Sequence, residues 1–233
     1  MRSRSTVPAG RTAGQRARHA LAVAARLTLA VSCSAAPAPA AAAPTPGATA
    51  PAAAVFGKVK PDAIVARVAN WVVASGNNRG ARFALVDKHA ATLYVFDARG
   101  VLEAHSPVLL GLTPGDRSPP GIGDKPLAQI TRTERTTPAG RFVLEADRNV
   151  HGGEILWVDY DNAVSMHPVR SVNRGERRLE RLATRTPADN RISYGCINVP
   201  AAFYHRWLGE RISGGVLYIL PEELAITSVF PLE

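Results

Sequence analysis

The sequence predicts a mainly β fold, a single β-sandwich or barrel domain with a few short helices. After about residue 80, short runs rich in β-branched and aromatic residues alternate apolar and polar positions with a period of two. Turn-forming stretches such as DARG and DYDN separate these runs, as in antiparallel hairpins. A run with helical periodicity precedes them. These observations favour one β domain covered by one amphipathic helix.

The predicted elements follow in chain order. The helix lies in PDAIVARVANWVVASG, residues 61–76, which begins near Asp62 and ends at Gly76. Its apolar residues share one face: Ile64, Val65, Val68, Trp71 and Val72. Seven runs predict strands: RFALVD (82–87), TLYVFD (92–97), VLEAHSPVLL (101–110), RFVLEA (141–146), EILWVDY (154–160), AVSMH (163–167) and GVLYIL (215–220).

Residues 1–43 are predicted to be a signal peptide. All six charged residues of this segment are arginines, the apolar stretch LTLAVSCSAA follows them, and small-residue sites such as Ala38-Pro39-Ala40 come next. The apolar stretch is shorter than the roughly 20 residues that span a bilayer. We therefore expect cleavage of the leader and export to the periplasm. A lipid anchor at Cys33 is the alternative.

Composition divides the rest of the chain and limits its partners. Without the six leader arginines, the formal net charge of +9 falls to +3, which argues against a nucleic-acid partner. The Ala- and Pro-rich residues 44–60 predict a linker, because they bury too little apolar surface to order themselves. The remaining predicted parts are an amphipathic helix at 61–80, a catalytic domain at 81–221 and a C-terminal tail at 222–233.

Three segments interrupt the strand pattern. Residues 111–126, rich in Gly and Pro, are either a flap near a site or an ordered surface excursion. Residues 169–191 hold seven arginines and predict a short helix with Leu179 and Leu182 facing inward. This insertion is either a solvated charge run or a cover that binds carboxylates. Residues 200–210 predict a helix with Pro200 in its first turn.

Cys196, in the stretch RISYGCINVP, has no partner if Cys33 leaves with the leader. Structural cysteines of exported proteins normally come in pairs, so this thiol is either a small buried hydrophobe or a nucleophile. The start of the 200–210 helix would lower its pKa and favour the thiolate. Gly195 would allow a tight turn that points backbone amides at an oxyanion beside the sulfur.

A nucleophilic thiol needs a base, and the candidates are His89, His105, His151, His167 and His205. His167 ends the strand AVSMH, and strand ends beside loops are where rigid scaffolds present catalytic groups. His151 lies in the turn-like stretch VHGGE and is the competitor. A structural role is the alternative for each of the five.

Four motifs, in order, resemble the L,D-transpeptidase (YkuD-type) catalytic domain family. VDKHAATLYVFDARG resembles the opening hairpin of that family, RTTPAGRFVL its T-P-x-G-x-[FY] strand, SMH its histidine strand, and ISYGCINVP its S-x-G-C-[IVL]-[RN] signature. The resemblance covers about residues 82–220. It implies an L,D-transpeptidase-like β fold and no metal or organic cofactor. The sequence contains no metal-binding spacing such as H-E-x-x-H.

In that family a cysteine attacks the peptide bond before the terminal D-alanine of a peptidoglycan stem peptide and passes the acyl group to a diaminopimelate amine. The resemblance implies that Cys196 is the nucleophile and His167 the general base. Gly195 and Tyr194 would supply oxyanion-hole amides, and Ser193 would help to place the histidine through its backbone.

The resemblance also implies two substrate contacts, and the sequence differs from the usual family pattern at three points. Asn198 takes the position of the signature's Arg or Asn, and it is expected to bind substrate together with Arg191. Tyr194 stands where many members have histidine, and Pro168 stands where glycine is usual. The step of 29 residues from His167 to Cys196 is longer than usual, since it contains the insertion.

The expected function is cysteine-dependent acyl transfer on peptidoglycan, with peripheral contact with the cell wall. An L,D-carboxypeptidase or cross-link hydrolase that uses the same cysteine and histidine is the first alternative. A non-catalytic wall-binding module with a buried Cys196 is the second. The sequence predicts neither the acceptor amine nor the oligomeric state.

Overall fold

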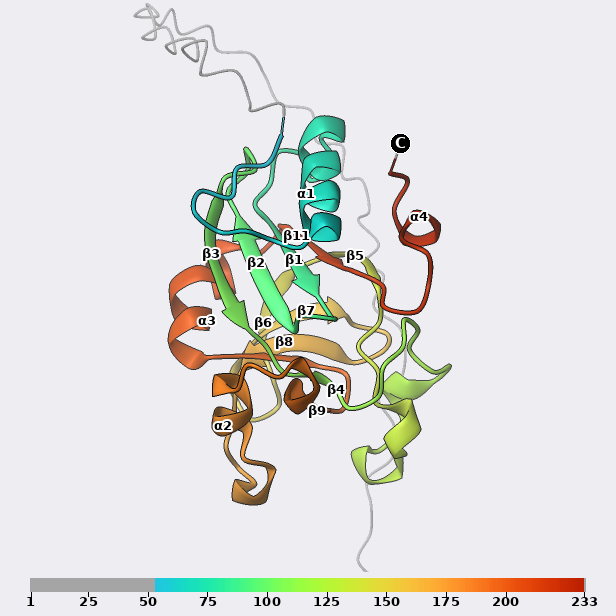
Figure 1. Cartoon of the computed structure of the whole chain (residues 1–233). Coiled ribbons are helices and arrows are strands. Elements are labelled where there is room, and N and C mark those ends of the chain that lie inside the picture. Colours follow the sequence, from blue (N-terminus) through green and yellow to red (C-terminus); the bar gives the residue numbers. More distant parts are fainter. Residues whose placement is uncertain (1–52, 233) are drawn as a thin grey trace, which may run out of the picture. The chain divides into compact units, whose positions relative to one another are not determined.

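The computed structural model describes residues 53–232, and these residues form the mainly β domain that the sequence predicts. The larger sheet has the strand order β3-β2-β1-β11-β5 (Figure 1). Its strands are β1 (Phe83–Asp87), β2 (Thr92–Phe96), β3 (Leu102–Pro107), β5 (Gly140–Val143) and β11 (Val216–Ile219). Strands β1 to β3 form an antiparallel meander, whereas β11 returns from the end of the chain to pair parallel with β1.

The second sheet has the order β10-β8-β7-β6. Its strands are β6 (Glu145–Arg148), β7 (Glu154–Asp159), β8 (Val164–Pro168) and β10 (Ile197–Val199). Strands β6 to β8 run antiparallel to one another, and β10 pairs parallel with β8. A two-stranded sheet of β4 (Leu110–Gly111) and β9 (Arg191–Ser193) completes the domain.

The main core lies between the two large sheets. Side chains alternate across a strand, so every second residue of each sheet points into this layer. The larger sheet contributes Ala84, Val86, Leu93, Val95, Leu217 and Ile219, and the second sheet contributes Leu156, Val158, Val164, Met166, Ile197 and Val199. The opposite face of the second sheet is therefore free to carry polar side chains.

Helix α1 (Ala63–Ser75) covers the other face of the larger sheet (Figure 1). It forms where the sequence predicts it: the Asp62 side chain accepts a hydrogen bond from the amide of Ile64, and Gly76 ends the helix with a left-handed backbone. Val65, Val68, Ala69 and Val72 are buried against the sheet. Phe230 and Leu232, near the end of the chain, pack into the same layer.

The remaining helices are short. They are α2 (Arg178–Ala183), α3 (Ala201–Trp207) and α4 (Ile226–Val229), with 3-10 turns at Ile122–Asp124, Leu127–Gln129, Arg132–Glu134, Arg174–Glu176, Pro187–Asn190 and Gly209–Arg211. The insertion contains the predicted helix, α2. Only Leu182 of its two leucines faces inward, since Leu179 is 58% exposed. The prediction for Leu179 was wrong: α2 buries Leu182, whereas Leu179, in its first turn, stays exposed.

A buried ion cluster fixes the segment 111–126 as an ordered excursion. The Nζ of Lys88 lies 2.6 Å from Asp116 and donates to the carbonyls of Gly115 and Thr137. Asp116 also accepts backbone hydrogen bonds from Glu222 and the two residues after it. The cluster ties the excursion to the C-terminal segment.

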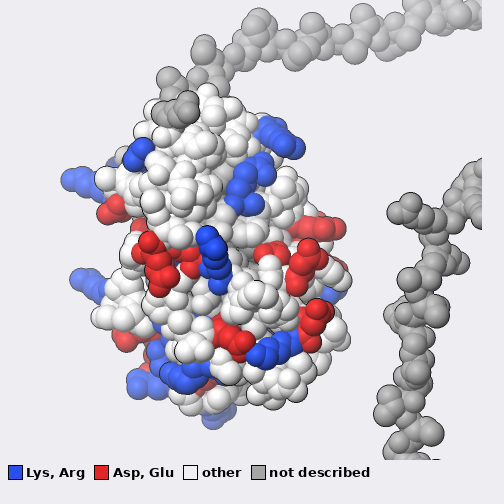
Figure 2. Space-filling model, turned by 90° about the vertical axis from the view of Figure 1, so that its right-hand side faces the viewer, with Lys and Arg blue, Asp and Glu red and all other residues white. Residues whose placement is uncertain are grey.

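Positive and negative side chains are interspersed on the face shown in Figure 2. Within residues 53–232, no helix has the length and apolar character needed to cross a membrane. The same described part of the chain contains no group of three or more His, Cys, Asp or Glu side chains placed to hold a metal ion. The predicted leader and residues 44–52 of the predicted linker lie outside the described residues. The rest of the predicted linker is ordered, contrary to the prediction, because Val55 pairs with Val101 and Phe56 packs against Phe96.

Candidate active site

Cys196 and His167 meet on the outer face of the second sheet. On β8, Met166 points into the core, so its neighbours Ser165 and His167 point outward. The parallel pairing of β8 with β10 sets Asn198 beside His167. Cys196 stands directly before β10, and its Sγ lies 3.6 Å from the Oγ of Ser165. Strand alternation and register thus bring together residues that are far apart in the sequence.

The surroundings of the Cys196 thiol favour its ionised form. Burial raises the pKa of the thiol, but the neighbouring imidazole of His167 and the hydrogen bonds of Ser165 outweigh burial. The pKa of Cys196 is therefore lowered. Because the thiolate is the reactive form of cysteine, this environment favours nucleophilic chemistry.

The hydrogen bonds of His167 define its tautomer. Its Nδ1 lies 2.9 Å from the carbonyl oxygen of Pro168, and its Nε2 lies 3.1 Å from the Nδ2 of Asn198. A carbonyl only accepts hydrogen bonds, so Nδ1 carries the proton and Nε2 presents a lone pair. An imidazole held in this way can take a proton at Nε2.

The turn before Cys196 depends on Ser193 and Gly195. The Oγ of Ser193 donates to the carbonyl of Cys196 at 2.6 Å and accepts from the amide of Gly195 at 3.1 Å. Gly195 has φ +124°, and a Cβ at this position would lie 2.8 Å from the carbonyl oxygen of Thr136. Both the backbone conformation and the close approach require glycine.

The stretch RTTP supports the same turn from the other side. The buried Thr137 donates through Oγ1 to the carbonyl of Gly195 at 2.8 Å. The guanidinium of Arg135 lies 3.8 Å from the centre of the Tyr194 ring. These contacts fix the backbone and the aromatic side chain that precede the thiol.

Cys196, His167 and Asn198 line a cavity of about 470 Å³. Its wall contains five residues of the insertion: Arg170, Val172, Asn173, Glu176 and Arg178. Leu127, which follows the excursion 111–126, completes the wall with Ser193 and Tyr194. The insertion therefore borders the candidate site.

Two of the residues predicted around the thiol have different contacts from those expected. The Gly195 amide donates to Ser193, so it is not free to bind an oxyanion. Ser193 shapes the turn at Cys196 and makes no hydrogen bond with His167. The amides of Tyr194 and Cys196, by contrast, donate no hydrogen bond to any group within residues 53–232.

The two residues expected to bind substrate also differ from the prediction. Asn198 is fully buried between His167 and Arg178, so it contacts the base rather than open solvent. Arg191 does not line the cavity that contains Cys196. Its guanidinium pairs with Glu222 and donates to the carbonyl of Lys88, which makes it part of the buried ion cluster.

The predicted helix N-terminus at Cys196 is wrong. Helix α3 begins at Ala201, and the strand β10 stands between it and the thiol. Three residues of strand span about 10 Å, so the first amides of α3 lie too far away to stabilise a thiolate. The lowered pKa of Cys196 comes from His167 and Ser165 instead.

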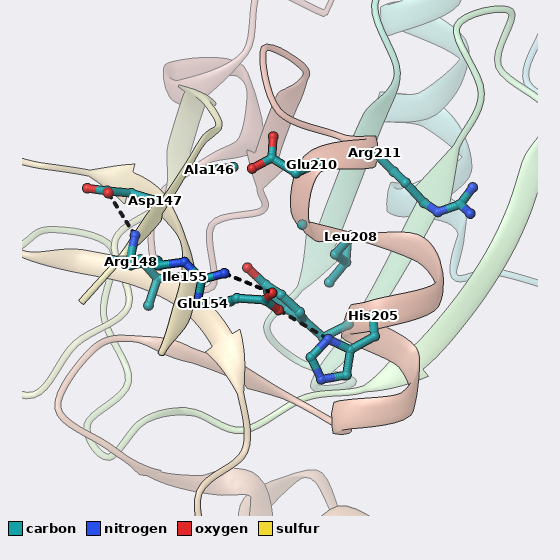
Figure 3. Close-up of a pocket in the computed structure, with 11 residues that line it drawn as sticks. Ala146, Asp147, Arg148, Glu154, Ile155, His205, Leu208, Glu210 and Arg211 are labelled. Carbon is teal, nitrogen blue, oxygen red and sulfur yellow. Dashed lines mark hydrogen bonds and ion pairs between the residues drawn. The ribbon is translucent and has the colours of Figure 1, made fainter. Parts of the chain in front are cut away.

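The other histidines have separate environments. His89 lies in the β1–β2 turn, His105 stacks on Tyr94 and His151 is exposed in the β6–β7 turn. His205 borders a second cavity of about 420 Å³ between α3 and the β6–β7 hairpin (Figure 3). There its Nδ1 lies 3.2 Å from Glu154, which also faces Arg148. The lining of this cavity includes neither Cys196 nor His167.

Sequence reasoning missed three residues of the site. Ser165 could have been found, because it stands two residues before His167 in one strand and so shares its face. Thr137 lies in a motif that was noted, but its contact with Gly195 is a tertiary one. Arg178, one of seven arginines in the insertion, carried no signal that set it apart.

No family model matches the sequence, and no curated protein matches it. Distant similarities to solved structures are found. The catalytic domain of an L,D-transpeptidase from E. faecium is 14% identical with a TM-score of 0.39, over 60% of this chain and 98% of that one. An L,D-transpeptidase from Mycobacterium smegmatis is 17% identical with a TM-score of 0.34, over 59% and 58%. One from Xylanimonas cellulosilytica is 14% identical with a TM-score of 0.37, over 60% of each chain.

These structures carry the name of the family that the four sequence motifs resemble. Identities and TM-scores this low do not assign an activity. The local geometry of the thiol and the imidazole has to support any function by itself.

Proposed function

We propose that the protein is an exported, cysteine-dependent L,D-transpeptidase that acts on peptidoglycan stem peptides. One observation carries the proposal. Cys196 and His167 line one cavity, the imidazole lowers the pKa of the thiol, and the Nδ1–H of His167 is held by the carbonyl of Pro168. Nucleophile, base and orienting group are the three parts that covalent acyl transfer needs.

The proposed reaction has two halves. In the first, Nε2 of His167 takes the thiol proton while the sulfur of Cys196 adds to the carbonyl carbon before the terminal D-alanine. The free amide of Cys196 supports the oxyanion that forms. The carbon–nitrogen bond then breaks, His167 returns the proton to the leaving amine, and D-alanine departs from a thioester.

In the second half, an acceptor amine adds to the thioester carbon and gives a proton to His167. The carbon–sulfur bond breaks, a new amide forms, and the thiol regains its proton. Water in place of the amine would give hydrolysis with the same residues. Arg170, which borders the cavity, supports a substrate that carries carboxylates.

Export belongs to the same proposal. The six arginines, the apolar stretch and the A-x-A sites of residues 1–43 support cleavage and release into the periplasm, where the cell-wall substrate lies. N-terminal sequencing of the periplasmic protein should find a start between about residues 34 and 44. A lipidated start at Cys33 would support an anchored form instead.

The test of activity is mass spectrometry of a purified stem tetrapeptide after incubation with the protein. A cross-linked dimer together with free D-alanine supports transfer. Tripeptide and D-alanine without dimer would indicate a carboxypeptidase. No D-alanine from the wild type would contradict both activities and favour a wall-binding module. Cys196→Ala should release none, and His151→Ala, altered in an exposed turn, should match the wild type.

A further inference from the structure

Asn198 connects the insertion to the candidate base. Its side chain is fully buried on β10, and its register partner on β8 is His167. On one side its Nδ2 lies 3.1 Å from the Nε2 of His167. On the other side its Oδ1 accepts a hydrogen bond from the Nη1 of Arg178, at the start of α2.

Arg178 determines which way the amide of Asn198 points. A guanidinium has only donors, so the group of Asn198 that faces Arg178 must be its oxygen. The amide NH₂ then faces His167. Since the NH₂ group donates, the Nε2 that meets it must be an acceptor. The carbonyl of Pro168 leads independently to the same tautomer from the other side of the ring.

Arg178 is itself held in place. Its Nε lies 2.5 Å from the carboxylate of Glu176, and its side chain is only 14% exposed. The titratable and charged groups that line the cavity with His167 are Arg170, Glu176, Arg178, Tyr194 and Cys196. Of these, Arg178 alone bonds to the amide that contacts Nε2.

We propose that Arg178 is a positioning residue that fixes the amide of Asn198 and thereby holds resting His167 in the Nδ1–H tautomer, with the lone pair on Nε2. In the other neutral tautomer Nε2 would point its N–H at the amide N–H of Asn198, and two donors repel. The amide would have to turn its oxygen toward the ring, which breaks the bond to Arg178. The insertion thus supplies part of the machinery of the base, and the catalytic meaning of this role rests on the proposed function.

The test is NMR of protein labelled with ¹⁵N-histidine, in which His167→Gln identifies the signals of His167. Wild type should show the Nδ1–H tautomer. Arg178→Met frees the amide, so its spectrum should show the Nε2–H tautomer of His167 beside the Nδ1–H tautomer. Arg181→Met is the matched control: Arg181 lies in the same helix and bonds to the carbonyls of Glu176 and Asp189, not to Asn198. It should leave the wild-type tautomer unchanged.

Arg178→Lys keeps a donor and should show less of the Nε2–H tautomer than methionine does, and it also serves if Arg178→Met does not fold. An Nε2–H tautomer in the wild type would overturn the inference. The same tautomer ratio in Arg178→Met and Arg181→Met would overturn it as well. If methionine does not fold, a ratio in Arg178→Lys equal to that of Arg181→Met would do so. The spectra do not depend on activity. If the tautomer ratio changes as expected while wild type releases no D-alanine, the proposed function fails and the role of Arg178 stands.

Discussion

The hydroxyl of Thr137 donates a hydrogen bond of 2.8 Å to the carbonyl of Gly195, which lies 58 residues further along the chain. The same hydroxyl accepts a hydrogen bond of 2.8 Å from the amide of Gly111. Thr137 is fully buried. One side chain therefore satisfies two buried backbone groups and fixes the turn that carries Cys196.

Thr137→Val keeps the shape of the side chain but leaves both backbone groups without a partner. We expect the free energy of unfolding to fall by about 2 kcal/mol, as measured by urea denaturation. Thr92→Val, which removes an exposed hydroxyl from β2, should cost less than about 0.5 kcal/mol. Equal losses in the two variants would mean that the Thr137 bonds do not stabilise the turn.

Gly195→Ala should abolish the reactivity of Cys196. The new Cβ would lie 2.8 Å from the carbonyl of Thr136 in a backbone with φ +124°, so the turn has to move. Gly152→Ala is the control, since Gly152 also has positive φ, +74°, but open space around it. Its stability should fall by about 1 kcal/mol without loss of thiol reactivity. Unchanged thiol labelling in Gly195→Ala would refute the geometry of the turn.

The pH dependence of stability should reveal the buried ion cluster. Burial raises the pKa of Asp116, but the Lys88 ammonium and three backbone amides outweigh it and lower the pKa to about 2. Folded Asp116 therefore binds protons more weakly than unfolded Asp116. Its contribution is complete above pH about 4 and is lost as the pH falls toward about 2.

Asp116→Asn tests the cluster at neutral pH. The substitution leaves Lys88, whose side chain is fully buried, without its closest counter-ion, so unfolding should become easier by about 3 kcal/mol. Asp97→Asn, at a more exposed turn, should cost about 1 kcal/mol. If Asp116→Asn retains the acid sensitivity of the wild type between pH about 4 and 2, the cluster is not its source.

Thiol titration distinguishes His167 from His151. Because the folded pKa of Cys196 is lowered, its iodoacetamide rate should rise with pH at an apparent pKa below the free-thiol value of about 8.5. His167→Ala should move this curve to higher pH, and His151→Ala should leave it in place. The opposite pattern would mean that the wrong strand has been assigned to the base.

The sequence predicts the scaffold better than it predicts the site. Alternation along 82–97 and the caps at Asp62 and Gly76 are local signals, and the elements form where those signals lie. Strands β9 and β10 have three residues each, too few to show a period, and they were missed. Missing β10 led directly to the wrong helix N-terminus at Cys196.

The site depends on contacts between segments that are distant in the sequence. Cys196 and His167 were found because a lone thiol and a strand-end histidine are unusual in themselves. Arg191 was expected to bind substrate, yet it is held by Glu222 from the C-terminal segment. Arg178 contacts Asn198 because the insertion folds back against β10, and no local sequence pattern predicts that tertiary contact.

The central claim is that Cys196 forms a thioester with a stem peptide. Intact-protein mass spectrometry after rapid acid quenching of a reaction with stem tetrapeptide tests it most directly. The wild type should gain the mass of the tetrapeptide less that of D-alanine, and peptide mapping should place the adduct on Cys196. Cys196→Ala should gain nothing. An adduct of the same mass in Cys196→Ala, or on any other residue of the wild type, would contradict the account.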